Sequence, residues 1–439
     1  GASRVDTTPP LHVPYLGFEP RQGTFEGVHD SLFARAAVFS RGDGHLAVVS
    51  VDALGLSRDL FGPGRDFVAE VRERAGAGTG LSRERILIAA THAHSTPETY
   101  GITRLWERED CAAWIETLAE QLARAIQSAW ADRRPAKLWH ASTTLRGMAR
   151  NRRRDDGPLD EELLVLLAER DDGGPVLLAN FACHPVTVQV QPLVSADFPG
   201  AAMALVEREL GPQTVALFLQ GAAGDINPVR GHTSDWRDVE TYGLMLGGAT
   251  LEAVGAARLS EACTDPIIAA RAETAMVEAR EAPSVEEAAA GAAAAQEGTA
   301  EARAAREALR LAQFGQELIP AEVQCLRIGD LALAAFPGEL FCALGQQVKR
   351  ASPAPATMVV ECANGCLGYL APCDEWERGG YEVGLGAWCR VAAGGPERMT
   401  EAAERLAAPS WCASSMAAGA EGTPGSGRPR YRRIRRCSG

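Results

Sequence analysis

Residues 85–95 read RILIAATHAHS and combine two features that decide the fold class: a short apolar run and, directly after it, two histidines. The run RILIAA predicts a buried strand. In α/β proteins the loops at the carboxyl ends of such strands carry the binding and catalytic residues. His92 and His94 are therefore candidates for a site at the edge of a sheet, although a pair of hydrogen-bonded structural histidines fits this motif equally well.

Further apolar runs flank this segment and alternate with helical stretches. Strands are expected at residues 45–54 (HLAVVSVDAL), 163–167, 176–181 (VLLANF) and 215–219 (VALFL), and helices at 65–74 and 200–210. Short apolar runs separated by helices are typical of strands that are covered on both faces. The sequence predicts an α/β fold with a layered mixed sheet covered by helices.

The second half of the chain has three distinct segments. Residues 277–311 are rich in Ala, Glu and Arg and contain no aromatic residue, which predicts one long surface helix. Residues 322–327 and 331–336 predict a β-hairpin around Gly329 and Asp330. Residues 413–439 are rich in Gly, Ser and Pro and then basic, which predicts a disordered tail after a single domain at residues 1–412.

Composition excludes several classes of function. The chain has 439 residues and a formal net charge of −13, which disfavours nucleic acid and anionic membrane surfaces as partners. It contains no apolar run of about 18 residues, so integral membrane association is not expected. No signal peptide is visible, and the eleven cysteines are most simply free thiols, so a cytoplasmic location is expected. Nothing in the sequence indicates an oligomeric state.

Two more candidate residues also follow apolar runs. His184 ends the run VLLANFAC and precedes Pro185, and Glu339 follows the run LALAAF. Each alone has an ordinary structural explanation, a core histidine or an acidic residue at a helix N-terminus. Together with His92 they supply two imidazoles and one carboxylate, which with an open fourth position make a catalytic zinc shell. We therefore expect a metal site at the strand ends.

The segment LQGAAGDINP, residues 219–228, follows another predicted strand. Its glycines permit close approach of the backbone to a ligand, and Asp225 and Asn227 are polar turn residues. Both are candidate substrate-binding residues, and a tight turn capped by these side chains is the equally simple structural alternative.

Taken in order, these motifs resemble those of the neutral/alkaline non-lysosomal ceramidases over roughly residues 8 to 400. The matching stretches are GVHD at 27–30, ARA at 34–36, THAHS at 91–95, NR at 151–152, FACHP at 181–185, GDINP at 224–228, PGE at 337–339, GY at 368–369, Glu375 and GYE at 380–382. Several ordered matches over most of a chain are more specific than any single motif.

The resemblance implies a role for each matching position. It implies that Zn²⁺ is held by His92, His184, Glu339 and Tyr369. It also implies that the reacting carbonyl is surrounded by His94, Arg152 and Tyr381.

Two departures from the family pattern change the expected chemistry and substrate. Asn227 replaces the family's serine, which excludes a serine nucleophile at that position. The glycines that follow the histidine motif in the family are replaced by Thr96, Pro97, Glu98 and Thr99. We expect a bulkier and more polar pocket wall, in which Glu98 contacts a cationic or hydroxylated group of the substrate.

These observations predict a zinc-dependent hydrolase that cleaves a linear amide (N-acyl) bond with metal-activated water. The expected partner is a small-molecule N-acyl substrate, smaller or more polar than ceramide, such as an N-acylated amine or an amino-acid-like metabolite. The alternatives are a zinc esterase, a ceramidase proper, or a catalytically inactive binding protein on the same fold.

Overall fold

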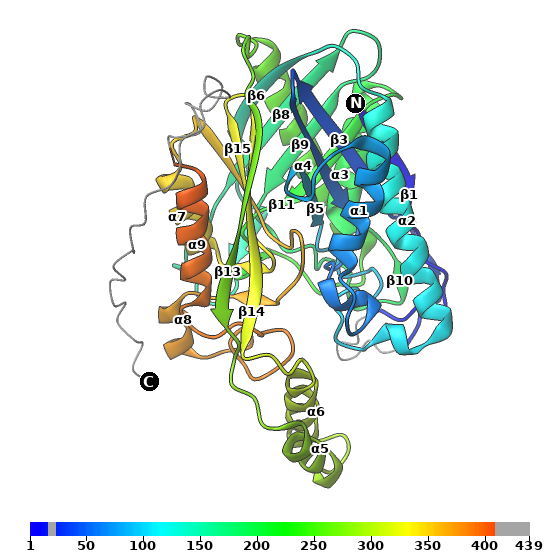
Figure 1. Ribbon diagram of the computed structural model, residues 1–439, viewed down its shortest axis with the longest axis vertical. Coiled ribbons are helices and arrows are strands. Elements are labelled where there is room, and N and C mark those ends of the chain that lie inside the picture. The colour runs from blue at the N-terminus through cyan, green and yellow to red at the C-terminus, as the bar shows by residue number, and fades with distance from the viewer. Residues whose placement is uncertain (16–22, 409–439) are drawn as a thin grey trace, which may run out of the picture.

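The computed structural model describes residues 1–15 and 23–408. The basic tail predicted at residues 413–439 lies outside the described residues. Three four-stranded sheets form the body, and helices cover their outer faces (Figure 1). The α/β fold class and the helix-covered mixed sheets predicted from the sequence are confirmed.

The first sheet is built from the N-terminal quarter of the chain. Its strands, in spatial order, are β1 (Ala2–Asp6), β3 (Phe33–Arg41), β4 (Gly44–Val51) and β5 (Ile86–Ala90). Only the pair β4 and β5 is parallel. The helices α1 (Phe67–Thr79) and α2 (Glu109–Ala131) pack against one face of this sheet. Asp66 caps the start of α1, and Gly80 ends it with a φ of +74°.

The second sheet follows the same plan. Its strands, in spatial order, are β11 (Val215–Gln220), β9 (Val176–Phe181), β8 (Glu162–Arg170) and β6 (Ala136–Thr144). The pair β9 and β11 is parallel. Two helices, α3 (Asp197–Leu210) and α4 (Trp236–Arg258), cover its outer face.

The third sheet comes from the C-terminal part of the chain. Its strands, in spatial order, are β13 (Ile268–Glu278), β14 (Leu318–Ile328), β15 (Leu331–Ala335) and β17 (Ala356–Val360). The hairpin predicted around Gly329 is the turn between β14 and β15. The helices α7 (Cys342–Ala351) and α9 (Gly395–Leu406) pack on the outer face of this sheet.

The inner faces of all three sheets share one apolar core, which explains why the central strands carry apolar residues on both faces. In β9, Leu177 and Phe181 face the α3–α4 layer, whereas Leu178 faces the shared core. The buried side chain of Asn180 donates hydrogen bonds to the carbonyls of Leu219 and Val359, both at 2.9 Å, and so links the second sheet to the third.

Short elements complete the described chain. They are three 3₁₀ turns (Arg58–Phe61, Arg83–Arg85, Leu105–Glu107), the helix α8 (Cys373–Arg378), and the paired short strands β2 (Gly27–Val28) with β10 (Leu193–Val194), β7 (Ala149–Asn151) with β12 (Ile226–Pro228), and β16 (Glu339–Leu340) with β18 (Tyr369–Leu370). No helix within the described ranges is both long and apolar enough to cross a lipid bilayer.

The long helix predicted at residues 277–311 is wrong. The segment first completes β13 and then forms a hairpin of two helices, α5 (Val285–Ala294) and α6 (Ala300–Ala312). Ser284 and Glu287 form a capping box that begins α5, and Thr299 caps α6. Gly298, with a φ of +84°, turns the chain between the helices. The helix propensity of this segment predicts helix correctly, but the caps within it divide it into two helices.

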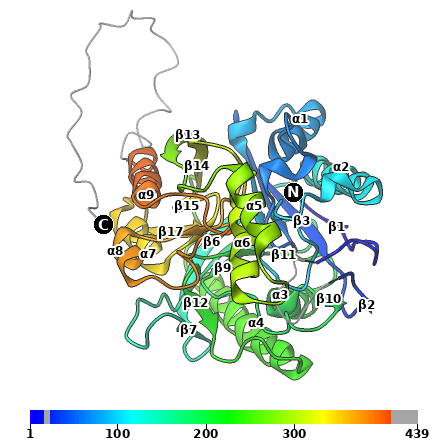
Figure 2. The same ribbon diagram turned by 90° about the horizontal axis from the view of Figure 1, so that it is seen from below.

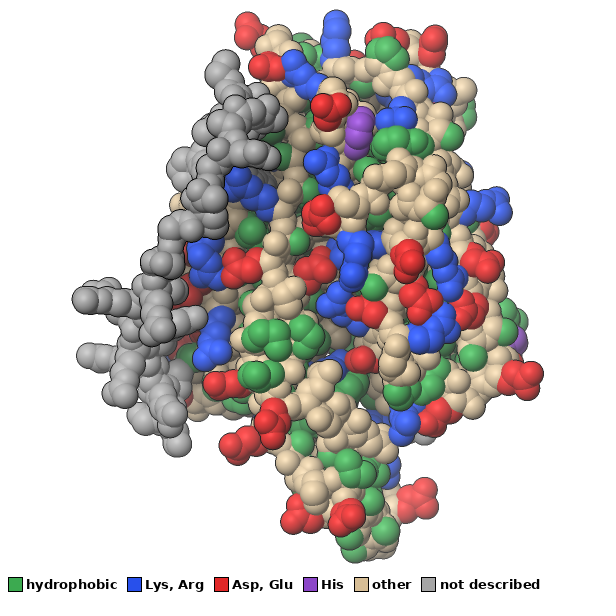
Figure 3. Space-filling view, viewed as in Figure 1, with side chains coloured by type: hydrophobic (Ala, Val, Ile, Leu, Met, Phe, Trp, Pro, Cys, Tyr) green, Lys and Arg blue, Asp and Glu red, His purple; other side chains and the backbone are tan. Residues whose placement is uncertain are grey.

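The α5–α6 hairpin stands apart from the three sheets. It forms the lower end of the molecule in Figure 1, and in the view from below it lies in front of the sheets (Figure 2). On the face shown in Figure 3, acidic and basic side chains are intermingled over the body.

Candidate functional site

His92 lies just beyond the carboxyl end of β5 in an unusual backbone conformation. Its φ is +67°, a value that few non-glycine residues adopt, and its side chain is fully buried. Its Nδ1 atom lies 2.5 Å from the carbonyl oxygen of Leu54. Because a carbonyl only accepts hydrogen bonds, Nδ1 carries the proton, and Nε2 of the neutral ring is left with a free lone pair.

His184 occupies the equivalent position after β9. Its Nδ1 atom lies 2.8 Å from the carbonyl oxygen of Ala223, so the neutral ring has the same tautomer as His92 and also presents the lone pair of Nε2. The carbonyl of the next residue, Pro185, accepts the N–H of His94 at 3.2 Å. The two histidine segments lie 92 residues apart in the chain. This hydrogen bond holds their loops side by side.

The lone-pair nitrogens converge on one point. The Nε2 atoms of His92 and His184 are 2.9 Å apart, and Nε2 of His94 is 3.3 Å from that of His92. The ligand atoms of the three histidines all lie within 4.8 Å of one another. Oε2 of Glu339, at the start of β16, lies 3.4 Å from His92 and 3.2 Å from His184.

This donor set fits a metal ion. When both imidazoles are neutral and donate through Nδ1, neither Nε2 carries a proton, so the two lone pairs face each other and a bound cation would accept both. Oε2 of Glu339 is buried and receives no hydrogen bond from the residues that the structure describes. A cation bound by these lone pairs and this oxygen would satisfy all of them.

The charges of the cluster are strongly coupled. Burial and the neighbouring His92 lower the pKa of His184 to about 4. Burial acts to lower the pKa of His92 as well, but the Glu339 carboxylate outweighs it and raises that pKa above its ordinary value. The same histidines hold the pKa of Glu339 well below its usual range in spite of burial. The metal-free fold therefore keeps a carboxylate charge at the point where the imidazoles meet.

Tyr369 lies beside the cluster, on β18. Its residue pairs in register with Glu339 on the parallel strand β16, and its ring stacks at 6.4 Å from the ring of His184. Burial raises the pKa of the phenol well above its ordinary value, while Arg152, whose guanidinium carbon is 5.2 Å from the ring centre, opposes that rise. Tyr369 is thus a neutral phenol in the metal-free protein, and its role as a metal ligand stays a prediction.

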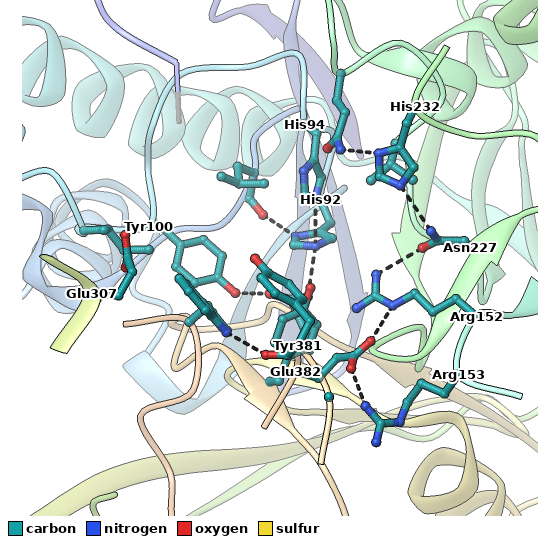
Figure 4. A pocket seen from close by; sticks show the side chains of 18 of the residues that line it. His92, His94, Tyr100, Arg152, Arg153, Asn227, His232, Glu307, Tyr381 and Glu382 are labelled. Atoms are coloured by element: carbon teal, nitrogen blue, oxygen red, sulfur yellow. Dashed lines mark hydrogen bonds and ion pairs between the residues drawn. The ribbon is translucent and has the colours of Figure 1, made fainter. Parts of the chain in front are cut away.

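A cavity of about 1010 Å³ opens onto this cluster (Figure 4). Seven of the residues predicted from the sequence line it: His92, His94, Arg152, Asn227, Glu339, Tyr369 and Tyr381. His184 lies behind this wall and reaches the cluster through Nε2. The ring of Tyr381 stacks on Trp388 at 4.9 Å and is about half exposed.

The expectation that Glu98 contacts the substrate is wrong. The side chain is fully buried and is not among the residues that line the cavity. Its carboxylate accepts the backbone N–H groups of Tyr100 at 2.9 Å, Ile102 at 3.2 Å and Thr103 at 3.1 Å. Glu98 therefore folds the loop after the histidine motif, and it is Tyr100 and Ile102 from this loop that face the cavity.

Asp225 also has a structural position instead of the predicted substrate contact. Oδ1 accepts the backbone N–H of Cys342 at 2.8 Å, at the start of α7, and Oδ2 accepts a hydrogen bond from Asn151 at 2.7 Å. Asp225 therefore matches the structural alternative for this segment, in which polar side chains cap a tight turn. Asn227, in contrast, does line the cavity.

Arg152 holds one wall of the cavity together. Its guanidinium donates to Glu382 at 2.7 Å, to Oδ1 of Asn227 at 3.1 Å and to the carbonyl oxygen of Gly224 at 2.9 Å. Burial acts to lower its pKa, but the neighbouring Tyr369 and Glu382 outweigh this effect and raise it. Because its donors are engaged with the protein, Arg152 mainly positions Asn227 and Tyr369.

Tyr100, His232 and Gln189 are among the lining residues that the sequence reasoning missed. The hydroxyl of Tyr100 donates a hydrogen bond to Oε1 of Glu339, 239 positions away in the chain. His232 contacts Gln189 through Nδ1 and lies 3.4 Å from the Asn227 amide through Nε2. Tyr100 follows the histidine motif closely, which was a usable signal, whereas nothing in the local sequence marks His232 or Gln189.

Comparisons with known proteins agree with the motifs. A family model described as "Neutral/alkaline non-lysosomal ceramidase, N-terminal" matches residues 1–240. The neutral ceramidases of Drosophila melanogaster and Drosophila pseudoobscura pseudoobscura are both 24% identical over 259 residues, which is 52% of this chain and 36% of theirs. The chain thus spans about a third of the length of these relatives.

Solved structures resemble the fold over most of the chain. A crystal structure of neutral ceramidase from Pseudomonas aeruginosa matches with a TM-score of 0.72 and 20% identity, over 93% of this chain and 73% of that one. A structure described as ceramidase complexed with C2 matches with a TM-score of 0.71 and 19% identity, over 92% of this chain and 73% of that one. The structural match covers a larger share of the chain than residues 1–240, which the family model matches.

Proposed function

The chain belongs to the neutral/alkaline non-lysosomal ceramidase family, and we propose that it is a zinc-dependent hydrolase that cleaves a linear amide (N-acyl) bond. The observation that carries this proposal is the convergence of the Nε2 atoms of His92, His94 and His184 with Glu339 at the base of a large cavity. Family membership supports amide hydrolysis, and the donor set supports a metal.

Zinc is the metal that we propose for this donor set. Imidazole nitrogens and one carboxylate are typical ligands of a catalytic zinc site. His92, His184 and Glu339 would hold the ion, with Tyr369 as the fourth ligand implied by the family motif. Zn²⁺ supplies Lewis acidity, which lowers the pKa of water to about 7 and polarises a carbonyl group.

The remaining side chains are proposed to bind the amide and move protons. His94 lines the cavity next to His92, and we propose that its imidazole accepts a proton from water and returns it to the leaving amine. Tyr381 offers a hydroxyl donor to the developing oxyanion. Asn227 has no nucleophilic oxygen, so we propose that water attacks the carbonyl and that no acyl-enzyme forms.

We propose a substrate smaller or more polar than ceramide. The reason differs from the one expected from the sequence, because Glu98 is not in the cavity wall. Arginines line much of the wall instead, and they include Arg154 and Arg378. Burying a long hydrocarbon chain against such groups would cost free energy.

The test combines metal content with turnover. The purified protein is reconstituted with zinc, freed of excess metal, and analysed for bound zinc and for hydrolysis of short N-acyl amides, matched esters and long-chain ceramide in detergent. The proposal predicts one zinc per chain and amide turnover that His92→Ala removes. The exposed His12, which pairs with Asp110 at 3.8 Å, gives the control variant His12→Ala.

Each outcome separates one alternative. Hydrolysis of esters alone would indicate an esterase, and a higher kcat/KM for ceramide than for the short amides would indicate a ceramidase proper. Bound zinc without turnover of any compound would indicate a binding protein. Absence of bound zinc after reconstitution would contradict the metal assignment.

A further inference from the structure

The helical hairpin contributes a charged face to the cavity. Arg303, Arg306 and Arg310 of α6 all line it, together with Glu307. Their spacing places the four side chains on one side of the helix. Glu301, the other charged residue of α6, is not part of the lining. The arginines of this helix are therefore directed to the cavity and not distributed around the helix.

A second group of arginines faces the same cavity from the body of the protein. Arg154 follows β7, and Arg378 is the last residue of α8. Each forms an ion pair with the carboxylate of Glu375, Arg154 at 3.8 Å and Arg378 at 3.6 Å. The same carboxylate also pairs with Arg153, at the shorter distance of 2.8 Å. One carboxylate cannot neutralise three guanidinium groups, so this wall also keeps a positive excess.

The net charge of the lining is opposite in sign to that of the chain. Seven arginines and four glutamates line the cavity, whereas the whole chain carries a net charge of −13. Three of the glutamates are paired with arginines of the lining: Glu307 with Arg310, Glu375 with Arg153, and Glu382 with Arg152. The fourth, Glu339, belongs to the histidine cluster. The lining thus carries more positive than negative charge, and the excess remains when Arg303 is left out of the count.

We infer that the substrate carries an anionic group, a carboxylate or a phosphate, and that Arg303 and Arg306 of α6 recognise it. Guanidinium groups form charge-assisted, often bidentate hydrogen bonds with these anions. This inference rests on the proposed function, which puts the scissile amide at the histidine cluster. Figure 4 shows Glu307 of α6 on the side of the cavity near Tyr100 and away from Asn227 and His232, so the anionic group would lie towards that side.

Three short probes with the same acyl length test this inference. N-octanoylethanolamine is neutral, N-octanoylglycine carries a carboxylate in its amine part, and the monoethanolamide of octanedioic acid carries one in its acyl part. Binding is measured by calorimetry on the metal-free full-length chain, and hydrolysis is measured separately on the zinc-loaded chain. Failure of hydrolysis alone would count against the proposed function, while the binding comparison still decides the inference.

We expect at least one anionic probe to bind about tenfold more tightly than the neutral probe, the effect of one charge-assisted hydrogen bond. The double variant Arg303→Gln/Arg306→Gln should lose this preference and keep its affinity for the neutral probe. Both arginines are exposed, and the Glu307–Arg310 pair is left intact. The matched control is Arg208→Gln/Arg237→Gln, which removes the same charge from sites outside the cavity.

Two results would overturn the inference. One is equal or tighter binding of the neutral probe by the unmodified chain. The other is an anion preference that the α6 double variant retains, or that the surface control loses to the same extent, because either would assign the effect to the overall charge of the protein.

Discussion

His92 and His184 direct their Nε2 atoms at each other across 2.9 Å, and each ring is held in place by a backbone carbonyl at its Nδ1 atom. The carbonyls belong to Leu54, in the loop after β4 of the first sheet, and to Ala223, in the loop after β11 of the second sheet. The protein therefore fixes the orientation and the tautomer of both rings before any metal binds. Such preorganisation makes the separate contribution of each histidine measurable.

The first prediction concerns the division of labour between His92 and His94. Replacing His92 with Ala removes a ring anchored for coordination and should reduce zinc binding. Replacing His94 with Ala should leave zinc bound but abolish turnover, because we assign its imidazole to proton transfer. Zinc content and hydrolysis of a short N-acyl amide are measured for both variants. Equal loss of metal from both would make His94 a ligand as well.

The second prediction is that Tyr100 supports the metal site through Glu339. The phenol donates a hydrogen bond to Oε1 of this carboxylate, while Oε2 faces the histidines. Tyr100→Phe should weaken zinc affinity by about tenfold or more, as expected for loss of a hydrogen bond that orients a ligand. Competition with a chelator measures the change. Tyr242→Phe, which removes a hydroxyl bonded to the backbone N–H of Arg230, is the control. Unaltered affinity in Tyr100→Phe would refute the supporting role.

The third prediction is that Glu98 stabilises the fold and does not select the substrate. In Glu98→Gln, the amide N–H₂ would face the N–H groups of Tyr100, Ile102 or Thr103, so at least one hydrogen bond would be lost. The free energy of unfolding should fall by about 2 kcal/mol, as measured by urea denaturation. Glu107→Gln, at a largely exposed side chain, serves as the control. A shift in substrate preference without loss of stability would restore Glu98 to the substrate site.

The fourth prediction is a loss of stability of the metal-free protein in acid. The pKa of His184 is about 4 in the fold, against an ordinary value of 6.5. Between these values the unfolded chain binds the extra proton, so the free energy of unfolding should fall as the pH falls from about 6.5 to 4. One residue with this shift accounts for up to about 3 kcal/mol.

Urea denaturation in the presence of a chelator, repeated across this pH range, measures the effect. His184→Asn cannot take up the proton, so its stability should depend less steeply on pH in the same window. Parallel pH profiles for the two proteins would show that another group is responsible.

The sequence by itself determined seven of the twelve strands in the three main sheets and the loops that carry the histidines, whereas β1, β3, β6, β13 and β17 were not predicted. The runs VLLANF and RILIAA are buried strands because both of their faces are apolar, and the histidines follow them directly. These features are local, so periodicity and motif order were enough to find them. The same local reasoning failed for residues 277–311, where helix propensity was plain but the capping residues that divide the segment were overlooked.

The tertiary structure alone decided which side chains face the cavity. Glu98 and Tyr100 are two residues apart, yet the carboxylate turns inward to the loop backbone while the phenol reaches Glu339. Arg303 and Arg306 lie far in sequence from the histidines but line the same cavity, because α6 lies beside it in the folded chain. Direction and long-range proximity depend on how the sheets and the hairpin pack, and no local pattern of residues encodes that packing.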